Sequence, residues 1–157
     1  MGIGDALALL GGGLAVGLSG IGAAFAMSYA QRATAGLISE KPELYGKTLI
    51  LQLIPAAAAL FGFVVGFMVM LNIGMGETPG YQLAEGALVL AACVPIALVG
   101  LGGTIAQGKV IASCVVMVGK RPEMLGRAIT LCILIELFLL LALIVSLLAV
   151  MAIPTIA

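Results

Sequence analysis

Long uncharged stretches separated by short clusters of charge dominate this chain. Except for Glu136, no charged side chain occurs in four stretches, residues 6–31, 48–76, 86–108 and 128–153. About 20 apolar residues are enough to cross the hydrocarbon core of a bilayer as a helix, in which every backbone group is hydrogen-bonded within the segment. The pattern therefore predicts an all-α membrane protein with four transmembrane helices in one membrane domain, residues 1–157.

The composition supports the same class and excludes several functions. The chain is 63% hydrophobic and 9% charged, whereas a soluble domain is typically about 25% charged. It contains no His and its net charge is zero, so we expect no nucleic-acid binding, no His-based metal site and no bound cofactor. No Gly-rich phosphate loop follows a strand, so the chain has no nucleotide site of its own. We interpret Cys93, Cys114 and Cys132 as small packing residues.

The positions of the cations predict an orientation. All seven lie in the first and third connections between the apolar stretches: Arg32, Lys41, Lys47, Lys109, Lys120, Arg121 and Arg127. The second connection, with Glu77 and Glu85, has none, and neither have the ends of the chain. Because cytoplasmic loops are enriched in Lys and Arg, we expect cytoplasmic loops at residues 31–47 and 109–127. Both termini then lie on the opposite side.

The chain is an internal duplication with an offset of 80 residues. Lys41-Pro-Glu43 recurs as Arg121-Pro-Glu123, and further identities at the same offset are Gly20 with Gly100, Gly22 with Gly102 and Ala26 with Ala106. The repeats cover about residues 5–76 and 85–153, which predicts two tandem helical hairpins of the same topology. This parallel repeat differs from the inverted repeats of many secondary transporters.

The first helix of each hairpin has a stripe of small side chains. The first stripe is Gly13, Gly17, Gly20, Ala24 and Ser28, and the second is Cys93, Ala97, Gly100, Thr104 and Gly108. Spacings of three and four place each stripe on one helical face, where small residues let membrane helices approach closely. The stripes favour either helix pairing inside one subunit or a tightly wound inner ring, packed through Gly13, Gly17, Gly20, Ala97 and Gly100. Bulky side chains on the second and fourth helices, such as Phe67 and Phe138, are expected to face lipid.

Glu136 is the anomaly in this pattern. A charged side chain at bilayer depth costs roughly 3 kcal/mol on insertion scales, so it must be neutral, paired or facing a cavity, and it marks an ion or proton pathway by default. Its repeat counterpart is Ala56, beside Pro55, so one ionisable site remains for four helices. Pro55 and Pro95 both fall inside predicted helices, where each removes a backbone hydrogen bond and can cause a kink.

Gln107 is the predicted polar partner of Glu136. The two residues are equidistant from the Lys120–Glu123 turn, so they share a depth if their helices are antiparallel. Alternatively, Gln107 caps an interfacial helix end beside Lys109. The other expected neighbours have no polar side chains: Ile54, Pro55, Ala57, Ala58 and Phe61. A sodium site needs several oxygens around the ion, so the sequence favours a proton, with sodium at Glu136 and Gln107 as the alternative.

Several motifs in order give a resemblance to a known family. They are Leu49-Ile-Leu-Gln-Leu-Ile-Pro55 with Phe61-Gly-Phe63, then Gly103-Thr-Ile-Ala-Gln-Gly-Lys109, then Arg121-Pro-Glu123 and Glu136. With four helices in two hairpins, the chain resembles the proteolipid rotor subunit, which forms the c-ring of vacuolar-type and archaeal-type ATPases. In bacterial enzymes of this type the same subunit is called K.

The resemblance implies a homo-oligomeric ring in a prokaryotic cell membrane. The ring would turn against a stator subunit, a or I, whose essential Arg releases the ion from Glu136, and central-stalk subunits would contact the cytoplasmic loops. The chain would not be an enzyme by itself, since ATP chemistry belongs to partner subunits. Sodium-carrying members have a Thr, a Gln and a Tyr where this chain has Ala57, Ala58 and Phe61, which again favours protons.

Two other functions stay open on the sequence. A small proton-coupled multidrug exporter would line its carboxylate with aromatic side chains to receive organic cations. Phe61 and Phe138 are the only aromatic residues expected near Glu136, and the parallel repeat is also unfavourable to an exporter. A packing protein, in which Glu136 only pairs helices, explains neither the repeat matches nor Gln107.

Overall fold

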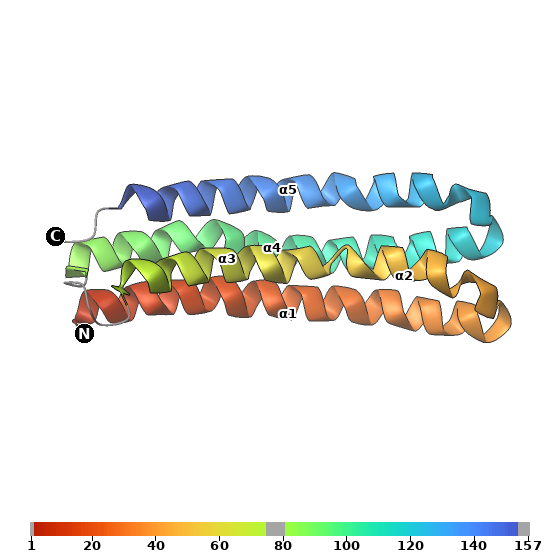
Figure 1. Ribbon diagram of the computed structural model, residues 1–157, viewed down its shortest axis with the longest axis horizontal. Coiled ribbons are helices and arrows are strands. Elements are labelled where there is room, and N and C mark those ends of the chain that lie inside the picture. The colour runs from red at the N-terminus through yellow and green to blue at the C-terminus, as the bar shows by residue number, and fades with distance from the viewer. Residues whose placement is uncertain (1, 75–80, 154–157) are drawn as a thin grey trace.

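A computed structural model, described for residues 2–74 and 81–153, shows a long antiparallel helical bundle. Its elements are α1 (Ile3–Glu40), η1 (Pro42–Leu44), α2 (Tyr45–Leu53), α3 (Ala56–Asn72), α4 (Leu83–Lys120), η3 (Pro122–Met124) and α5 (Leu125–Ala152). The start of α1 and the end of α5 lie at one end of the bundle, and the connections from α1 to α2 and from α4 to α5 lie at the other (Figure 1).

The predicted fold class is confirmed. Within the described residues, four helical segments are long and apolar enough to cross a membrane, and the second consists of η1, α2 and α3 together. No strand occurs in residues 2–74 and 81–153. Residues 75–76 of the second predicted stretch and residues 77–80 of the second connection, including Glu77, lie outside the described residues.

The expected loops 31–47 and 109–127 are wrong in extent. α1 continues to Glu40 and α4 to Lys120, so each connection is a single residue followed by one 3₁₀ turn. Each helix ends two residues before Pro42 or Pro122, because proline disfavours a helical conformation for the residue that precedes it, here Lys41 or Arg121. At 1.5 Å per residue, the 38-residue α1 is about 57 Å long, so it extends well beyond a hydrocarbon core of about 30 Å.

α1 and α4 pack against each other through glycines along most of their lengths. A Cβ atom added to Gly22 would lie 2.1 Å from the Gly100 carbonyl oxygen, and one added to Gly108 would lie 2.3 Å from Ala26 Cα. Near the start of both helices, a Cβ on Gly86 would lie 2.1 Å from the Gly4 carbonyl oxygen. These approaches leave no room for a side chain, so the backbones of the two helices are in contact.

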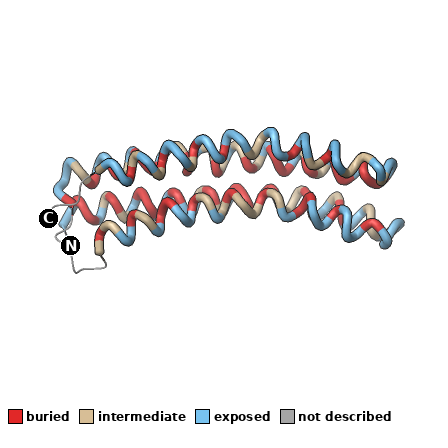
Figure 2. Tube along the Cα trace, turned by 45° about the horizontal axis from the view of Figure 1, so that its top comes forward, coloured by how far each residue is buried: buried red, intermediate tan, exposed pale blue. Residues whose placement is uncertain are grey.

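The two small-residue stripes differ in their surroundings, which corrects the expectation that both face the same way. Cys93, Ala97 and Gly100 are buried against α1 inside the chain. By contrast, Gly13 and Gly17 are exposed, and a Cβ added to Gly13, Gly17 or Gly20 would meet no atom within 4 Å. Exposed positions follow the outer side of each helix and buried positions the inner side (Figure 2). Helix pairing inside the chain therefore accounts for the α4 stripe but not for the α1 stripe.

Two prolines have different effects on their helices. Pro55 separates α2 from α3, whereas Pro95 lies inside an uninterrupted α4. Beside Pro95, the Ile96 N–H donates to Ser146 Oγ of α5 at 3.2 Å, and Ser19 Oγ of α1 donates to the Ile96 carbonyl at 3.2 Å. Neighbouring helices thus supply hydrogen bonds where a proline disturbs the backbone.

Candidate functional site

Glu136 lies near the middle of α5, where its side chain faces α4 and is half-buried. Gln107 of α4 is completely buried. Its Nε2 donates to Glu136 Oε2 at 2.7 Å and to the Cys132 carbonyl oxygen at 3.3 Å. The structure therefore brings the two sequence-predicted polar residues together. Because Gln107 has no exposed surface, it does not cap an interfacial helix end.

The two bonds to Nε2 fix the orientation of the Gln107 amide. A primary amide has two N–H donors, and here one points to the carboxylate and the other to a main-chain carbonyl one helical turn away. A hydrogen bond with an ionised partner contributes about 1.5–3 kcal/mol. The amide is therefore positioned in advance to hold the ionised form of Glu136.

Two buried oxygens at this site have no hydrogen-bond partner. Within the described residues, neither Glu136 Oε1 nor Gln107 Oε1 accepts a hydrogen bond. Leaving a buried acceptor unsatisfied costs about 1–3 kcal/mol. Both atoms are acceptors, so a proton or a small cation would satisfy the site, whereas a second acceptor would not.

The wall of the site on the α3 side is apolar. Ala58 is fully buried in a cluster with Ala23 and Leu139, and Phe61 packs against this cluster. Leu139 is one turn after Glu136 on α5. This part of α3 thus places methyl and aromatic groups beside the carboxylate-bearing helix and supplies no side-chain oxygen.

The remaining predicted lining residues lie at the break between α2 and α3. Ile54 packs against the cluster that contains Cys132, Pro55 is buried, and Ala57 is half-buried. Within the described residues, no group of three or more His, Cys, Asp or Glu side chains is placed to hold a metal ion. Cys93, Cys114 and Cys132 are buried and not in disulfides, as expected for packing residues.

The carbonyl of Cys132 is a site component that the sequence analysis missed. Every residue has a main-chain carbonyl, so residue type carries no signal for it. Two further buried polar side chains were not predicted as site candidates, Gln52 on α2 and Thr104 on α4, which was named only for its small size. Within the described residues, Gln52 Nε2 and Thr104 Oγ1 have no hydrogen-bond partner. Thr104 is one turn before Gln107, and Gln52 is the repeat counterpart of Cys132. A polar residue inside an apolar stretch was the available signal for both.

A family model described as the ATP synthase C subunit matches the chain twice, over residues 10–69 and 90–149. The two matched segments begin 80 residues apart, which is the offset of the internal repeat. Each segment includes most of one hairpin. The duplication inferred from individual residue identities thus agrees with two separate matches to a single family.

Two characterised relatives are similar over most of this chain. The V-type sodium ATPase subunit K of Enterococcus hirae is 36% identical over 133 residues, which cover 85% of this chain and 83% of that protein. The A-type ATP synthase subunit K of Methanocaldococcus jannaschii is 26% identical over 141 residues, covering 90% of this chain and 61% of that protein.

Proposed function

The chain belongs to the ATP synthase C-subunit family, and we propose that it forms the rotor ring of a V-type or A-type rotary ATPase and carries protons on Glu136. The contact between Glu136 and Gln107 carries this proposal. Glu136 is one reversibly ionisable group with one fixed donor, near the middle of a helix that is long and apolar enough to cross a membrane. Such a group can be neutral while it faces lipid and charged where it meets a cation.

Proton transport is supported by the chemistry of the side chains around Glu136. A dehydrated sodium ion needs several oxygen ligands to replace its lost hydration shell. The neighbouring part of α3 provides Ala57, Ala58 and Phe61 instead. A proton needs one lone pair, and Glu136 Oε1 has no partner among the described residues. Because the chain is similar to a sodium ATPase subunit, sodium is the competing cargo. The side chains of Ala57, Ala58 and Phe61 disfavour sodium because they offer no oxygen ligand.

The open stripe on α1 supports assembly into a ring of identical copies. Gly13 and Gly17 have empty space in front of them, in a groove that Phe63 and Phe67 of α3 also line. Small residues are the usual contact surface of membrane helices, so this groove suits a helix of a neighbouring copy. On α5, Phe138 is 64% exposed, as suits a lipid-facing surface.

The same proposal includes the partners of the ring. The ring would turn against a stator Arg. Central-stalk subunits would bind at the α1–α2 and α4–α5 connections, on the cytoplasmic side of a prokaryotic cell membrane. The cations that cluster near these connections, such as Lys41 and Arg121, support this orientation because cytoplasmic loops are enriched in Lys and Arg.

Dicyclohexylcarbodiimide labelling of the assembled ring tests the cargo, because this reagent reacts with protonated carboxyl groups in apolar surroundings. Glu136 is expected to be labelled selectively, at a rate that excess sodium at alkaline pH does not change. Protection by sodium would overturn the proton assignment and leave the rotor role standing. A detergent-extracted protein that runs as a monomer or dimer would overturn the rotor role itself.

A gain-of-function variant makes the test sharper. The combined substitutions Ala57→Thr, Ala58→Gln and Phe61→Tyr introduce the three side chains that sodium-carrying members of the family have at these positions. This ring is expected to acquire sodium protection of Glu136 that the parent lacks. The single substitution Ala59→Thr, at an adjacent position of α3, is the matched control and should not confer protection.

A further inference from the structure

The ends of α1 and α4 are joined by one side chain. Lys41, the residue that follows α1, donates from Nζ to the carbonyl oxygen of Gly119 in the last turn of α4 at 2.7 Å. The last carbonyls of a helix have no partner within the helix and carry partial negative charge. Lys41 therefore caps α4 from the other repeat.

The repeat counterparts of Lys41 and Gly119 lie on the outer sides of the chain. Arg121 is the counterpart of Lys41, and Ser39 is the counterpart of Gly119. Arg121 is exposed, and its side chain donates no hydrogen bond within the described residues. The last turn of α1 contains no basic side chain, and Pro42 brings no N–H to it. The Lys41 N–H caps the Leu37 carbonyl at the end of α1, but within the described residues the Ser39 carbonyl accepts from no side chain. One repeat thus has an unused cation, and the other has a helix-end carbonyl without a side-chain donor.

The glycine faces of α1 and α4 show the same relation between a contact inside the chain and an exposed counterpart. Inside the chain, Gly22 of α1 meets Gly100 of α4. Their counterparts are Gly102 of α4 and Gly20 of α1, and neither would bring an added Cβ within 4 Å of another atom. A second copy placed beside α4 by the operation that relates repeat 1 to repeat 2 would bring its Gly20 against Gly102.

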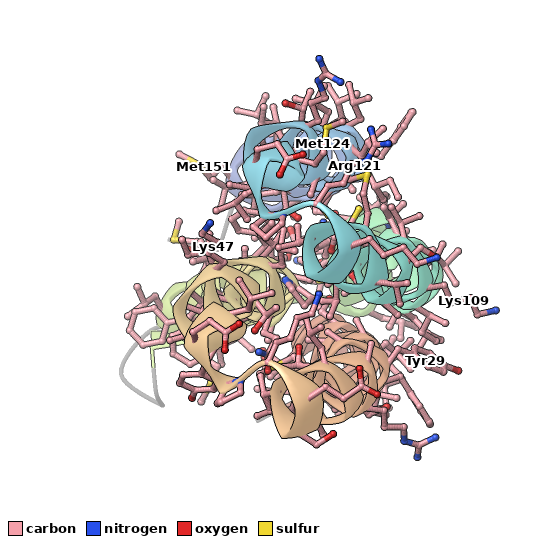
Figure 3. All side chains as sticks on the ribbon, turned by 90° about the vertical axis from the view of Figure 1, so that its right-hand side faces the viewer. Tyr29, Lys47, Lys109, Arg121, Met124 and Met151 are labelled. Carbon is pink, nitrogen blue, oxygen red and sulfur yellow. The ribbon has the colours of Figure 1, made fainter. Side chains whose placement is uncertain are left out.

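We propose that Arg121 of each copy caps the α1 helix of the next copy, by donating from its guanidinium to the main-chain carbonyl of Ser39. This inference rests on the proposed ring and specifies its register at the connection end of the bundle. Figure 3 looks onto that end and shows Arg121 at the α4–α5 connection. The partner is a second copy of this chain, because a copy presents both the Gly20 face and a Ser39 carbonyl that accepts from no side chain within the described residues.

Thiol cross-linking of the whole ring tests this register. The double variant Ser39→Cys with Arg121→Cys, treated with a short bifunctional thiol reagent, is expected to give a ladder of dimers, trimers and larger species on denaturing gels. The pair Ser28→Cys with Arg121→Cys is the matched control, since Ser28 is about 16 Å further along α1 and should give no ladder. The three native cysteines are buried, so the unmodified chain provides the background.

The outcomes separate this inference from the proposed function. An intact ring that gives no ladder with the Ser39 and Arg121 pair overturns the register and leaves the rotor role standing. A parent protein that forms no ring overturns both.

Thermal dissociation of the ring in detergent is the second measurement. Arg121→Gln should lower the dissociation temperature by several degrees, Arg121→Lys should restore most of the loss, and Lys120→Gln should have no effect. Equal temperatures for the parent and the Arg121→Gln ring would contradict the proposed cap.

Discussion

The two hairpins share a topology, but among the described residues only the second has an ionisable side chain near the middle of its apolar helices. Glu136 and Gln107 form a hydrogen-bonded pair in repeat 2, and the corresponding residues of repeat 1 are Ala56 and Met27. The helix that bears Glu136 is continuous, whereas the equivalent helix of repeat 1 is interrupted at Pro55. Repeat 1 therefore supplies an apolar wall where repeat 2 supplies the proposed proton carrier.

The first helices of the hairpins differ in which face is covered. The stripe on α4 is buried by α1 of the same chain, whereas the corresponding stripe on α1 is open. The duplicated sequence thus provides two copies of one contact surface, and a single chain can use only one of them. The remaining copy has to be covered from outside the chain.

Removing the carboxylate of Glu136 in repeat 2 should have the largest effect on ion transport. Glu136→Gln keeps the size and polarity of the side chain but cannot take up or release a proton. ATP-driven ion uptake by vesicles containing the whole complex is expected to fall to background, while the ring still assembles. Glu123→Gln, which removes an exposed carboxylate in the turn, is the control and should transport normally. Continued transport by the Glu136→Gln ring would remove Glu136 from the mechanism.

Restoring a carboxylate to repeat 1 should destabilise the protein unless a donor is restored with it. Ala56→Glu places a carboxyl group opposite Met27, which offers no hydrogen bond, at a cost of roughly 3 kcal/mol. The yield of assembled ring should fall, and adding Met27→Gln should recover most of it. Equal yields of the single and the double variant would show that the two repeats do not present equivalent positions.

Loss of the donor in repeat 2 should slow transport without abolishing it. Gln107→Leu removes a bond to the carboxylate that contributes about 1.5–3 kcal/mol, so ion uptake should fall between about 10-fold and 100-fold. Gln52→Leu, which removes a buried amide of repeat 1, should leave uptake within twofold of the parent. A Gln107→Leu ring that transports at the parent rate would limit Gln107 to a packing role.

Adding one methyl group should distinguish the covered face from the open face. Gly22→Ala forces α1 and α4 apart at a cost of about 1–3 kcal/mol, and the extracted chain should lose thermal stability measured by circular dichroism. Gly20→Ala meets no atom inside the chain, so it should weaken only the ring. Equal losses of chain stability for both variants would refute the assignment of the two faces.

The smallest effect is expected where α1 supports the Pro95 region of repeat 2. Ser19→Ala removes the hydroxyl that donates to the Ile96 carbonyl. Hydrogen bonds between membrane helices contribute about 0.6 kcal/mol on average. Thermal unfolding should shift slightly downward, whereas Ser28→Ala, which removes a hydroxyl bonded within its own helix, should cause no shift. A Ser19→Ala shift as large as that of Gly22→Ala would contradict this view of the contact.

Much of the fold and the centre of the site could be predicted from the sequence. Charge-free stretches indicated the four membrane helices, because a helix pairs every backbone group within its own segment in lipid. The relation of Gln107 to Glu136 followed from their equal distance to one turn. The chain folds locally into antiparallel hairpins, so spacing along the sequence becomes depth in the membrane.

Other features depended on contacts that the sequence does not encode locally. Charges at Arg32 and Lys109 indicated where the apolar stretches end, but the helices continue past them to Glu40 and Lys120. Lipid thickness limits the apolar segment, whereas hydrogen bonding and the following proline limit the helix. The helix is therefore longer than the apolar stretch that it contains.

Four membrane helices, two repeated hairpins and one carboxylate level with one amide could all be inferred from the order of the residues. Three features became clear only from the packed helices: α4 buries its small stripe while α1 leaves its own open, Pro55 interrupts a helix while Pro95 does not, and the Cys132 carbonyl orients Gln107. α1 has small residues on more than one face, and its composition therefore permits several close contacts. Which face is used depends on the helix that packs there.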